Sequence, residues 1–297
     1  MNIKKIIRKP IRMIKKMVGY EEIYTIAIRK RDESSLYEGN EAPFSQILIS
    51  DDYWYADPIV ISEDNNTYLF CEAYEKKGNV GRIAISEIDS EGNATNPQII
   101  LEEEYHMSFP TVFCWNNMWY MVPETSENES INLYKAILFP SSWELVKSWK
   151  INKKIVDSVV LYYDQREVSF LASEYQDKDL FKYRFVKYKI KQSGNELLLE
   201  WDDDFNDSAL YNYHDRIGGT PIEIDNKKVI ITQSGTDIDY GVSIRYRNID
   251  NLKSIKVKEI GPKDISINGI KKSDCIGVHT YAVCDDFEII DMRYLKH

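Results

Sequence analysis

Apolar and polar side chains recur in a fixed order along the chain, in units of about 50 to 60 residues. Each unit opens with a short segment rich in Asp, His, Gly or Pro, and then passes through a polar turn into an apolar strand that ends on an acid or an amide. The units open at Tyr55–Pro58, His106–Pro110, Val156–Ser158, Arg216–Pro221 and Gly277–Thr280. A strand repeat of this length predicts an all-β, five-bladed β-propeller, because one blade cannot bury its faces without its neighbours.

The later strands of each unit follow the same period. Second strands are predicted at Tyr68–Glu72, Trp119–Glu124, Val168–Glu174, Val229–Gln233 and Phe287–Asp291. Turn sequences such as Glu63–Asn66 favour tight hairpins between strands. Third strands follow at Arg82–Ser86, Ile131–Lys135, Phe185–Lys189 and Val242–Tyr246. The fifth unit ends after two strands, so we expect residues around Tyr20–Arg31 and Phe44–Ser50 to complete the last blade and close the ring.

The first 18 residues follow a different pattern. At about 100° per residue, their aliphatic side chains fall on one side of a helix and their charged side chains on the other. The charged residues are Lys4, Lys5, Arg8, Lys9, Arg12, Lys15 and Lys16. Residues 1–19 are therefore predicted to form a basic amphipathic helix on an anionic membrane surface, where each cation contributes about 1 kcal/mol. Pro10 either kinks this helix or marks its start.

A signal peptide or a helix packed on protein would fit the pattern of this segment less well. A signal peptide needs an uninterrupted apolar run, whereas these charges are interleaved throughout. A helix packed on the propeller or on a partner protein would explain the apolar side but not the single sign of the charge. Nucleic acid is not an expected partner, because the chain carries −10 and the segment +7, which leaves −17 on the rest. We expect a cytoplasmic protein at the inner face of the cell membrane.

Composition bears on the domain count and on the cysteines. The 297 residues suit one closed propeller over residues 20–297, and 21 tyrosines suit half-buried strand positions. No run approaches the roughly 20 apolar residues that a membrane-spanning helix needs. The four cysteines lack metal-binding or redox spacing, which favours buried free thiols over disulfides. They are Cys71, Cys114, Cys275 and Cys284.

Carboxylates near the expected axis of the ring are candidate catalytic groups. Asp57 lies three residues after Trp54, whose ring could stack on a sugar, and Asp157 opens the third unit. Glu72 and Glu124 end second strands. Glycosyl transfer or hydrolysis uses two carboxyl groups about 5 Å apart, or roughly 6.5 to 9.5 Å apart when a water molecule lies between them. The alternative is that these acids cap strands or bond the backbone of a neighbouring blade.

Histidine, arginine and amide side chains lie close to the same positions. His106, His214 and His279 lie near unit openings, which favours hydrogen bonds to sugar hydroxyls or phosphate. Arg216 could clamp a phosphate, although the Gly-Gly pair that follows it could equally form a bulge. Gln233 ends a second strand with an amide. No ligand pair is close in sequence, so no metal site and no cofactor are predicted, and a divalent metal is left open.

Longer motifs accompany these positions in a fixed order. They are Trp54–Pro58, Gly81–Ala84, Tyr105–Pro110, Val122–Ser126, Ile131–Ala136, Phe139–Trp143, Arg216–Pro221, Asp239–Gly241 and Gly277–Tyr281. In this order they resemble the N-terminal domain family of glucosamine inositolphosphorylceramide transferase and its bacterial relatives, over roughly residues 45–295. The resemblance implies the five-bladed propeller of arabinanases and invertases. It also implies a bacterial protein that accompanies other surface-polysaccharide enzymes, such as sugar formyltransferases.

The sequence departs from these relatives at two points. In the plant protein a separate C-terminal domain is the recognised glycosyltransferase, and these 297 residues include no match to it. Arabinanase-like hydrolases place an Asp in the first strands of blades one and two and a Glu in a later blade. Asp57 matches the first position, whereas Ser108–Pro110 offers no carboxylate at the second. Glu124 or Asp157 would have to replace it, which favours a phosphorylated donor or lipid-linked glycan over plain hydrolysis.

Three functions follow from these observations. The first is a glycosyltransferase of surface-glycan assembly that moves a sugar from an activated donor to a lipid-linked or glycan acceptor. In that enzyme Asp57 is the base or nucleophile, Glu124 or Asp157 the acid, and Arg216 with His214 the phosphate clamp. The second is a glycoside hydrolase of the propeller type. The third is a non-catalytic glycan-binding partner of a separate transferase.

Overall fold

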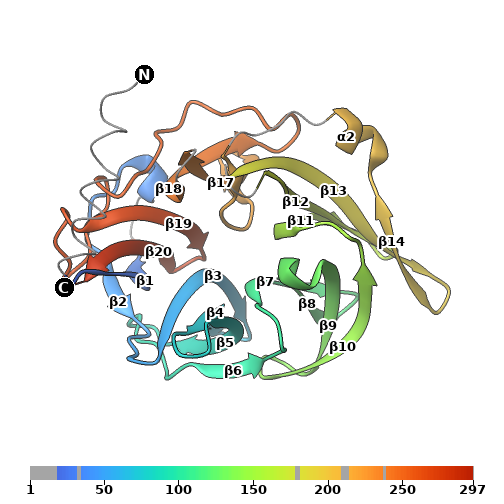
Figure 1. The fold of residues 1–297 in the computed structure, drawn as a ribbon, viewed down its shortest axis with the longest axis horizontal. Coiled ribbons are helices and arrows are strands. Elements are labelled where there is room, and N and C mark those ends of the chain that lie inside the picture. The colour runs from blue at the N-terminus through green and yellow to red at the C-terminus, as the bar shows by residue number, and fades with distance from the viewer. Residues whose placement is uncertain (1–18, 32–34, 178–180, 209–213, 237–238, 297) are drawn as a thin grey trace.

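The chain folds into a five-bladed β-propeller, as the repeat predicts (Figure 1). The computed structural model describes residues 19–31, 35–177, 181–208, 214–236 and 239–296. These residues form five sheets of four strands, and the strands pair antiparallel within each sheet. The predicted basic helix falls on residues 1–18, which lie outside the described residues.

The blades follow one another along the chain. Blade one contains β3 (Tyr53–Glu63), β4 (Asn66–Glu75), β5 (Val80–Ile88) and β6 (Gln98–Leu101). Blade two contains β7 (Ser108–Trp115), β8 (Met118–Glu124), β9 (Ser130–Leu138) and β10 (Ser142–Lys150). Blade three contains β11 (Ile155–Tyr163), β12 (Glu167–Asp177), β13 (Lys182–Ser193) and β14 (Glu196–Trp201).

The remaining elements complete the ring. Blade four contains β15 (Arg216–Ile217), β16 (Ile222–Ile224), β17 (Lys227–Thr236) and β18 (Asp239–Asn248). Blade five contains β19 (Cys275–Val283), β20 (Phe287–Lys296), β1 (Glu21–Lys30) and β2 (Ser45–Ile47). The described helices are short: η1 (Leu36–Glu38), η2 (Ser126–Asn128) and α2 (Asp203–Ser208). All four cysteines are free, with Cys71 buried and the others partly buried.

The first hairpins of three blades turn through two consecutive left-handed residues. These pairs are Asp64 with Asn65, Asn116 with Asn117, and Asp225 with Asn226, and all six residues have φ between 49° and 62°. A type I′ turn requires positive φ at both central positions, and Asn and Asp tolerate it better than other side chains. The polar turn sequences therefore fix the lengths of these hairpins locally.

Both ends of the chain share blade five. β1 pairs with β20 over ten residues, from Glu21 opposite Lys296 to Lys30 opposite Phe287. β2 then pairs with β1, so the sheet order is β19, β20, β1, β2. Because strands from the two ends lie in one sheet, the ring closes through backbone hydrogen bonds.

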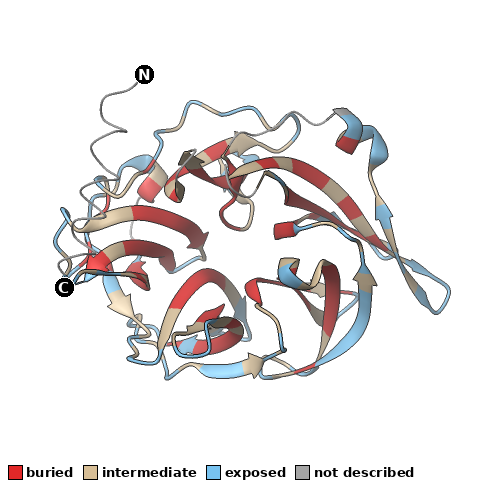
Figure 2. Cartoon of the chain, viewed as in Figure 1, coloured by how far each residue is buried: buried red, intermediate tan, exposed pale blue. Residues whose placement is uncertain are grey.

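The hydrophobic core lies between neighbouring blades, where Figure 2 shows the buried residues along the strands. Phe70 of blade one, Phe109 of blade two and Phe185 of blade three belong to one buried cluster. Phe170 and Tyr188 of blade three stack with ring centroids 4.9 Å apart in another. Full burial of one such aromatic side chain stabilises the fold by roughly 1.5 to 3 kcal/mol.

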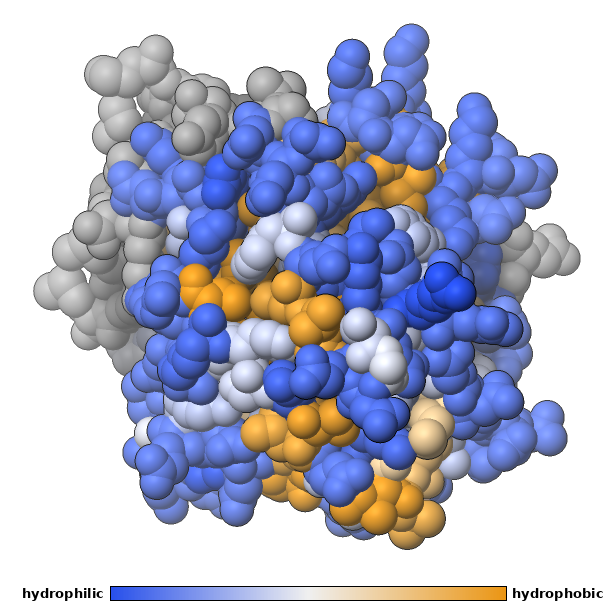
Figure 3. All heavy atoms as spheres, turned by 90° about the vertical axis from the view of Figure 1, so that its right-hand side faces the viewer, coloured by the Kyte–Doolittle hydropathy of each residue, from blue (hydrophilic) through white to orange (hydrophobic). Residues whose placement is uncertain are grey.

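The side of the ring that faces the viewer in Figure 3 is mostly hydrophilic, with hydrophobic patches between the polar side chains. On the β9–β10 hairpin the exposed hydrophobic residues are Ile137, Leu138, Leu145 and Val146. The pairing of β10 with β9 is irregular between Leu145 and Lys147. Such an irregularity and the nearby lysine make this edge a poor template for pairing with another strand.

Blade four departs from the regular pattern. Its inner strand is divided into β15 and β16, and both pair with β17. After β18 the chain runs through residues 249–274 without a regular outer strand. Isolated bridges from Arg247 to Ser254 and from Ile244 to Ile260 hold this segment against β18.

Candidate active site

The inner strands are interrupted at the unit openings that the sequence repeat identifies. In β3 the register shifts between Ala56 and Ile59, and β7, β11 and β19 shift at equivalent places. Asp57, Phe109 and Asp157 lie within these shifts with positive φ angles of 52°, 42° and 49°. A β-bulge re-aims the side chain that it carries. The five openings therefore carry the side chains from which the site is built.

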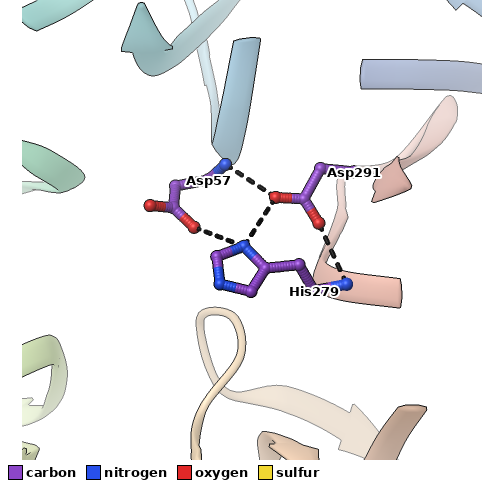
Figure 4. A group of neighbouring side chains, drawn as sticks. All are labelled: Asp57, His279 and Asp291. Carbon is purple, nitrogen blue, oxygen red and sulfur yellow. Dashed lines mark hydrogen bonds and ion pairs between the residues drawn. The ribbon is translucent and has the colours of Figure 1, made fainter. Parts of the chain in front are cut away.

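His279 of β19 lies between carboxylates of blades one and five (Figure 4). Its Nδ1 is 3.1 Å from Asp57 Oδ1 and 3.0 Å from Asp291 Oδ2. Asp57 Oδ1 also accepts a hydrogen bond from the Thr280 hydroxyl, and Asp291 Oδ2 accepts one from the Asp57 backbone N–H. Burial alone would lower the pKa of His279, but the two carboxylates raise it well above its ordinary value. His279 is therefore an imidazolium that joins two blades.

Asp57 and Glu72 lie on neighbouring strands of blade one and differ in pKa. Burial alone would raise the pKa of Asp57, but the charge of His279 lowers it overall. Burial and the charge of Asp57 raise the pKa of Glu72 well above its ordinary value. His106 Nδ1 accepts the Gly81 N–H at 2.9 Å, so its proton lies on Nε2, which is 3.3 Å from Glu72 Oε1. The pKa values of these two neighbouring acids are thus shifted in opposite directions.

Arg216 at the start of β15 joins blades two, three and four. It donates two hydrogen bonds to Asp157, one from Nε to Oδ2 and one of 2.9 Å from a terminal nitrogen to Oδ1. The same terminal nitrogen lies 4.0 Å from Glu124 Oε2. The centre of the guanidinium lies 5.8 Å from the Tyr183 ring and 5.3 Å from the Tyr240 ring. Burial alone would lower the pKa of Arg216, but the Asp157 carboxylate raises it.

Aromatic side chains surround the ionic groups. The hydroxyls of Tyr24 and Tyr240 lie 2.9 Å apart, and both rings pack edge-on against His279, with centroids at 5.6 and 5.4 Å. Trp54 stacks on Tyr74 with centroids 5.2 Å apart and an interplanar angle of 11°. Rings with polar tips provide an apolar wall and hydrogen-bonding groups in one place, which suits a sugar.

Several buried polar atoms in and around the site have no hydrogen-bond partner among the described residues: Glu124 Oε2, Gln233 Oε1, His279 Nε2, Trp54 Nε1 and the Tyr183 hydroxyl. A Cβ atom on Gly241, where φ is 57°, would lie 2.8 Å from His279 Cδ2 and 3.4 Å from Gln233 Oε1. Only a glycine at this position lets the two side chains approach the same point. Buried polar atoms without partners are rare, so these atoms indicate where ligand hydroxyls bind.

Most of the residues singled out from the sequence come together around the axis. Ion pairs link them in three groups: Asp57 with His279, Glu72 with His106, and Glu124 and Asp157 with Arg216. Gln233 and His279 both lie near Gly241, and Trp54 packs near Tyr24. His214 Nδ1 is 3.1 Å from the carbonyl oxygen of Phe181, whose ring centroid lies 5.7 Å from that of Tyr240.

Sequence reasoning missed several residues of the site. Asp291 accepts hydrogen bonds from three backbone N–H groups and from His279, and Thr280 binds Asp57. Asp291 ends the second strand of its unit, as Glu72 and Gln233 do in theirs, so its position in the repeat was an available signal. Tyr240 lies within the Asp239–Gly241 motif, which was an available signal, whereas nothing in the sequence distinguishes Tyr24 from the other tyrosines.

Within the described residues, the cluster of Asp57, His279 and Asp291 has side chains of the types that bind a metal ion. One atom each from Asp57, His279 and Asp291 lie within 4.8 Å of one another. The nitrogen-to-oxygen distances of 3.0 and 3.1 Å are hydrogen-bond lengths, and metal ligands lie closer to their ion, at about 2.0 to 2.6 Å. A proton on Nδ1 therefore holds the cluster together, and a metal ion would have to replace it.

Comparison with known proteins identifies the family. The family described as "Glucosamine inositolphosphorylceramide transferase 1, N-terminal" matches residues 45–277. The chain belongs to this family. Glucosamine inositolphosphorylceramide transferase 1 of Oryza sativa subsp. indica is 27% identical over 221 residues, which cover 73% of this chain and 29% of that protein. The protein of the same name from Arabidopsis thaliana is 36% identical over 110 residues, 37% of this chain and 14% of that protein.

This family member spans less than a third of the length of these plant relatives. Among solved structures it is similar to the catalytic domain of Coprinopsis cinerea GH62 alpha-L-arabinofuranosidase, with a TM-score of 0.53 and 13% identity over 84% of this chain and 95% of that one. A GH62 hydrolase in complex with xylotriose has a TM-score of 0.50 and 12% identity over 92% and 96%. The predicted family and its fold relationship to propeller hydrolases are thereby confirmed. Within the described residues, no helix has the length and hydropathy to cross a bilayer.

Proposed function

We propose that this family member is a carbohydrate-active enzyme that transfers a glycosyl unit from an activated donor to a glycan or lipid-linked acceptor of the cell surface. The name of the family and of its plant relatives supports transfer. The observation that carries the proposal is the pair of buried acids on adjacent strands, Asp57 and Glu72, whose pKa values are shifted in opposite directions.

The proton movements follow from the states of these two acids. Asp57 takes the proton of an acceptor hydroxyl while the hydroxyl oxygen attacks the anomeric carbon. Glu72 gives its proton to the departing oxygen as the bond from that carbon breaks. His279 and Thr280 keep Asp57 ionised and oriented through the contacts at 3.1 Å.

Glu124 and Asp157 act differently from Glu72 in this proposal, although the sequence suggested either as the acid. Both bonds from Arg216 go to Asp157, which makes this carboxylate a support for the arginine. Glu124 keeps one oxygen for a sugar hydroxyl. Asp157 does not bond the other terminal nitrogen of Arg216. We propose that this nitrogen and His214 contact the phosphate of the donor.

Glycoside hydrolysis is the second candidate, because the same two acids would serve it with water in place of the acceptor hydroxyl. The fold that this family member shares with GH62 hydrolases supports it. The two candidates differ in the substrate that binds: a transferase needs an activated donor, whereas a hydrolase binds a glycan alone.

The proposed place of action is the cytoplasmic face of the cell membrane of a bacterium. It rests on the seven cations and no acids of residues 1–18. At that face the enzyme would meet lipid-linked acceptors and other enzymes of glycan assembly.

The test is a thermal-shift screen against nucleotide sugars and free oligosaccharides, followed by turnover assays of the compounds that bind. A ligand at about 100 times its dissociation constant adds roughly 2.7 kcal/mol of stability. We expect a shift with a nucleotide sugar, and turnover that Asp57→Asn and Glu72→Gln each abolish while exposed Asp51→Asn retains it. Binding and turnover of free glycans alone would establish the hydrolase, and binding without any turnover would leave a glycan-binding module.

A further inference from the structure

Residues 249–274 form a strip along the outside of blades four and five, in the place of a regular outer strand (Figure 1). Bridges tie the strip to blade four at Ser254 and Ile260. A parallel bridge between Phe44 and Ile267 ties it to the chain before β2 of blade five. The strip is therefore a fixed part of the rim.

The strip carries more lysines than acids, and its lysines are exposed. These lysines, here called the basic rim, are Lys253, Lys256, Lys263, Lys271 and Lys272. No ion pair joins any of them to another described residue. The strip has six lysines and four acids, a net charge of +2. Two of these acids are paired, because Glu259 lies 2.9 Å from Arg245 and Asp264 lies 2.8 Å from Lys258. The basic rim thus contrasts with a body whose net charge is −17 once residues 1–18 are set aside.

The basic rim lies near the point where residues 1–18 join the body. Glu21, the first residue of β1, pairs with Lys296. The adjacent Leu295 donates its N–H to the Asp274 carbonyl at 3.0 Å, two residues after Lys272. The chain that follows the seven cations of residues 1–18 therefore enters blade five at the end where the basic rim finishes.

We infer that the basic rim docks on an anionic lipid bilayer, with lipid headgroups as its partner. A bilayer presents its negative charge in a plane, so a strip on the rim can contact it while the acidic remainder of the body stays away. At physiological salt, charges more than about 8 Å from the headgroups are largely screened, so the acidic body hardly opposes this contact. A flexible polyanion such as nucleic acid could reach around the body and would meet its negative charge.

Vesicle co-sedimentation of the full chain tests this surface, with phosphatidylcholine vesicles that contain or lack phosphatidylglycerol. Three substitutions, Lys256→Gln, Lys263→Gln and Lys272→Gln, are combined in one variant. Each lysine near an anionic surface contributes binding free energy. The loss of three lysines should therefore lower the partition coefficient about 100-fold. We expect this loss on the anionic vesicles, and weak binding of all proteins to phosphatidylcholine alone.

A matched control removes three exposed lysines of blades one to three, Lys77→Gln, Lys147→Gln and Lys154→Gln, with the same change in net charge. This control is expected to bind the anionic vesicles like the unmodified protein, and both variants to unfold at an unchanged temperature. Equal losses in the two variants, or no loss in the basic-rim variant, would overturn the proposal. So would a heparin column that separates the two variants when vesicles do not. Turnover assays without vesicles keep this outcome separate from the proposed enzymatic function.

Discussion

Two clusters at the propeller axis have the same plan, a cation held by two acids from different blades, but they differ in chemistry. His279 lies between Asp57 and Asp291, at 3.1 and 3.0 Å. Arg216 is bonded twice to Asp157 and lies 4.0 Å from Glu124. The imidazolium can lose its proton within the range of accessible pH, whereas the guanidinium cannot.

This difference indicates that the Arg216 cluster supports the fold and that the His279 cluster takes part in ligand binding. The planar fork of Arg216 matches the carboxylate of Asp157 and fixes three blades relative to one another. His279 uses only Nδ1 for its two carboxylates, so Nε2 is left for a ligand. We therefore expect the Arg216 cluster to dominate stability, and the His279 cluster to dominate ligand binding and its dependence on pH.

The largest expected effect is the loss of the arginine. Arg216→Met leaves Asp157 and Glu124 buried without their cation, and should lower the free energy of unfolding by about 3 to 5 kcal/mol. Chemical denaturation measures this change. Arg166 is exposed, so the control Arg166→Met should change the free energy of unfolding by less than about 0.5 kcal/mol. A loss below about 1 kcal/mol would show that Arg216 does not support the fold.

His279→Gln should cost less, about 2 to 3 kcal/mol near neutral pH, because an amide can still donate to one carboxylate. The folded pKa of His279 is raised, so its stabilisation is fully present below the unfolded value of about 6.5 and is lost as pH rises through the folded pKa. Denaturation curves of protein and variant should therefore converge in alkaline solution. A constant difference across that range would contradict the assignment of an imidazolium.

Gly241→Ala tests the close approach beside His279. Its Cβ would lie 2.8 Å from His279 Cδ2, and φ is 57°, so we expect a loss of about 2 kcal/mol and weaker sugar binding. Gly269→Ala is the matched control, because φ is 81° and no atom lies within 4 Å of its Cβ position. Only the backbone strain of about 1 kcal/mol should remain there. Equal losses of stability and of sugar binding in the two variants would show that the contact between residue 241 and His279 is not important.

The smallest effect is expected from Tyr24→Phe, which removes the hydroxyl that lies 2.9 Å from Tyr240. One such hydrogen bond contributes about 1 kcal/mol, and exposed Tyr163→Phe should change stability by less than about 0.5 kcal/mol. The melting temperature in the presence and absence of ligand measures both effects. If Tyr24→Phe lowers the melting temperature by the same amount with and without ligand, Tyr24 supports the fold and does not orient His279 for ligand binding.

The fold could be predicted from the sequence because its signals are local. The Asp-Asn and Asn-Asn pairs at residues 64, 116 and 225 turn the chain through positive φ without help from distant residues. The fivefold recurrence of openings at residues such as Asp57 and Asp157 then fixes the number of blades. The irregular outer layer of blade four, which replaces a strand with residues 249–274, has no such local signal.

The site could be predicted only in part. Glu72, Glu124 and Gln233 each follow the apolar run of a second strand, and that shared position in the repeat indicates that they approach the same region. The sequence does not indicate which carboxylate pairs with which cation. Phosphate binding by Arg216 together with His214 stays a prediction. In the structure Arg216 bonds Asp157, and His214 Nδ1 lies 3.1 Å from the Phe181 carbonyl oxygen.

The sequence by itself determined the strands, the tight turns and the number of repeats of this protein, because each depends on residues a few positions apart. Only the tertiary structure decided that Thr280 binds Asp57 across 223 positions and that His279 lies between two aspartates. These contacts depend on closing the ring, which brings blade one against blade five. Burial then decides the protonation of Asp57, Glu72 and His279, since charge interactions are strong only where water is excluded.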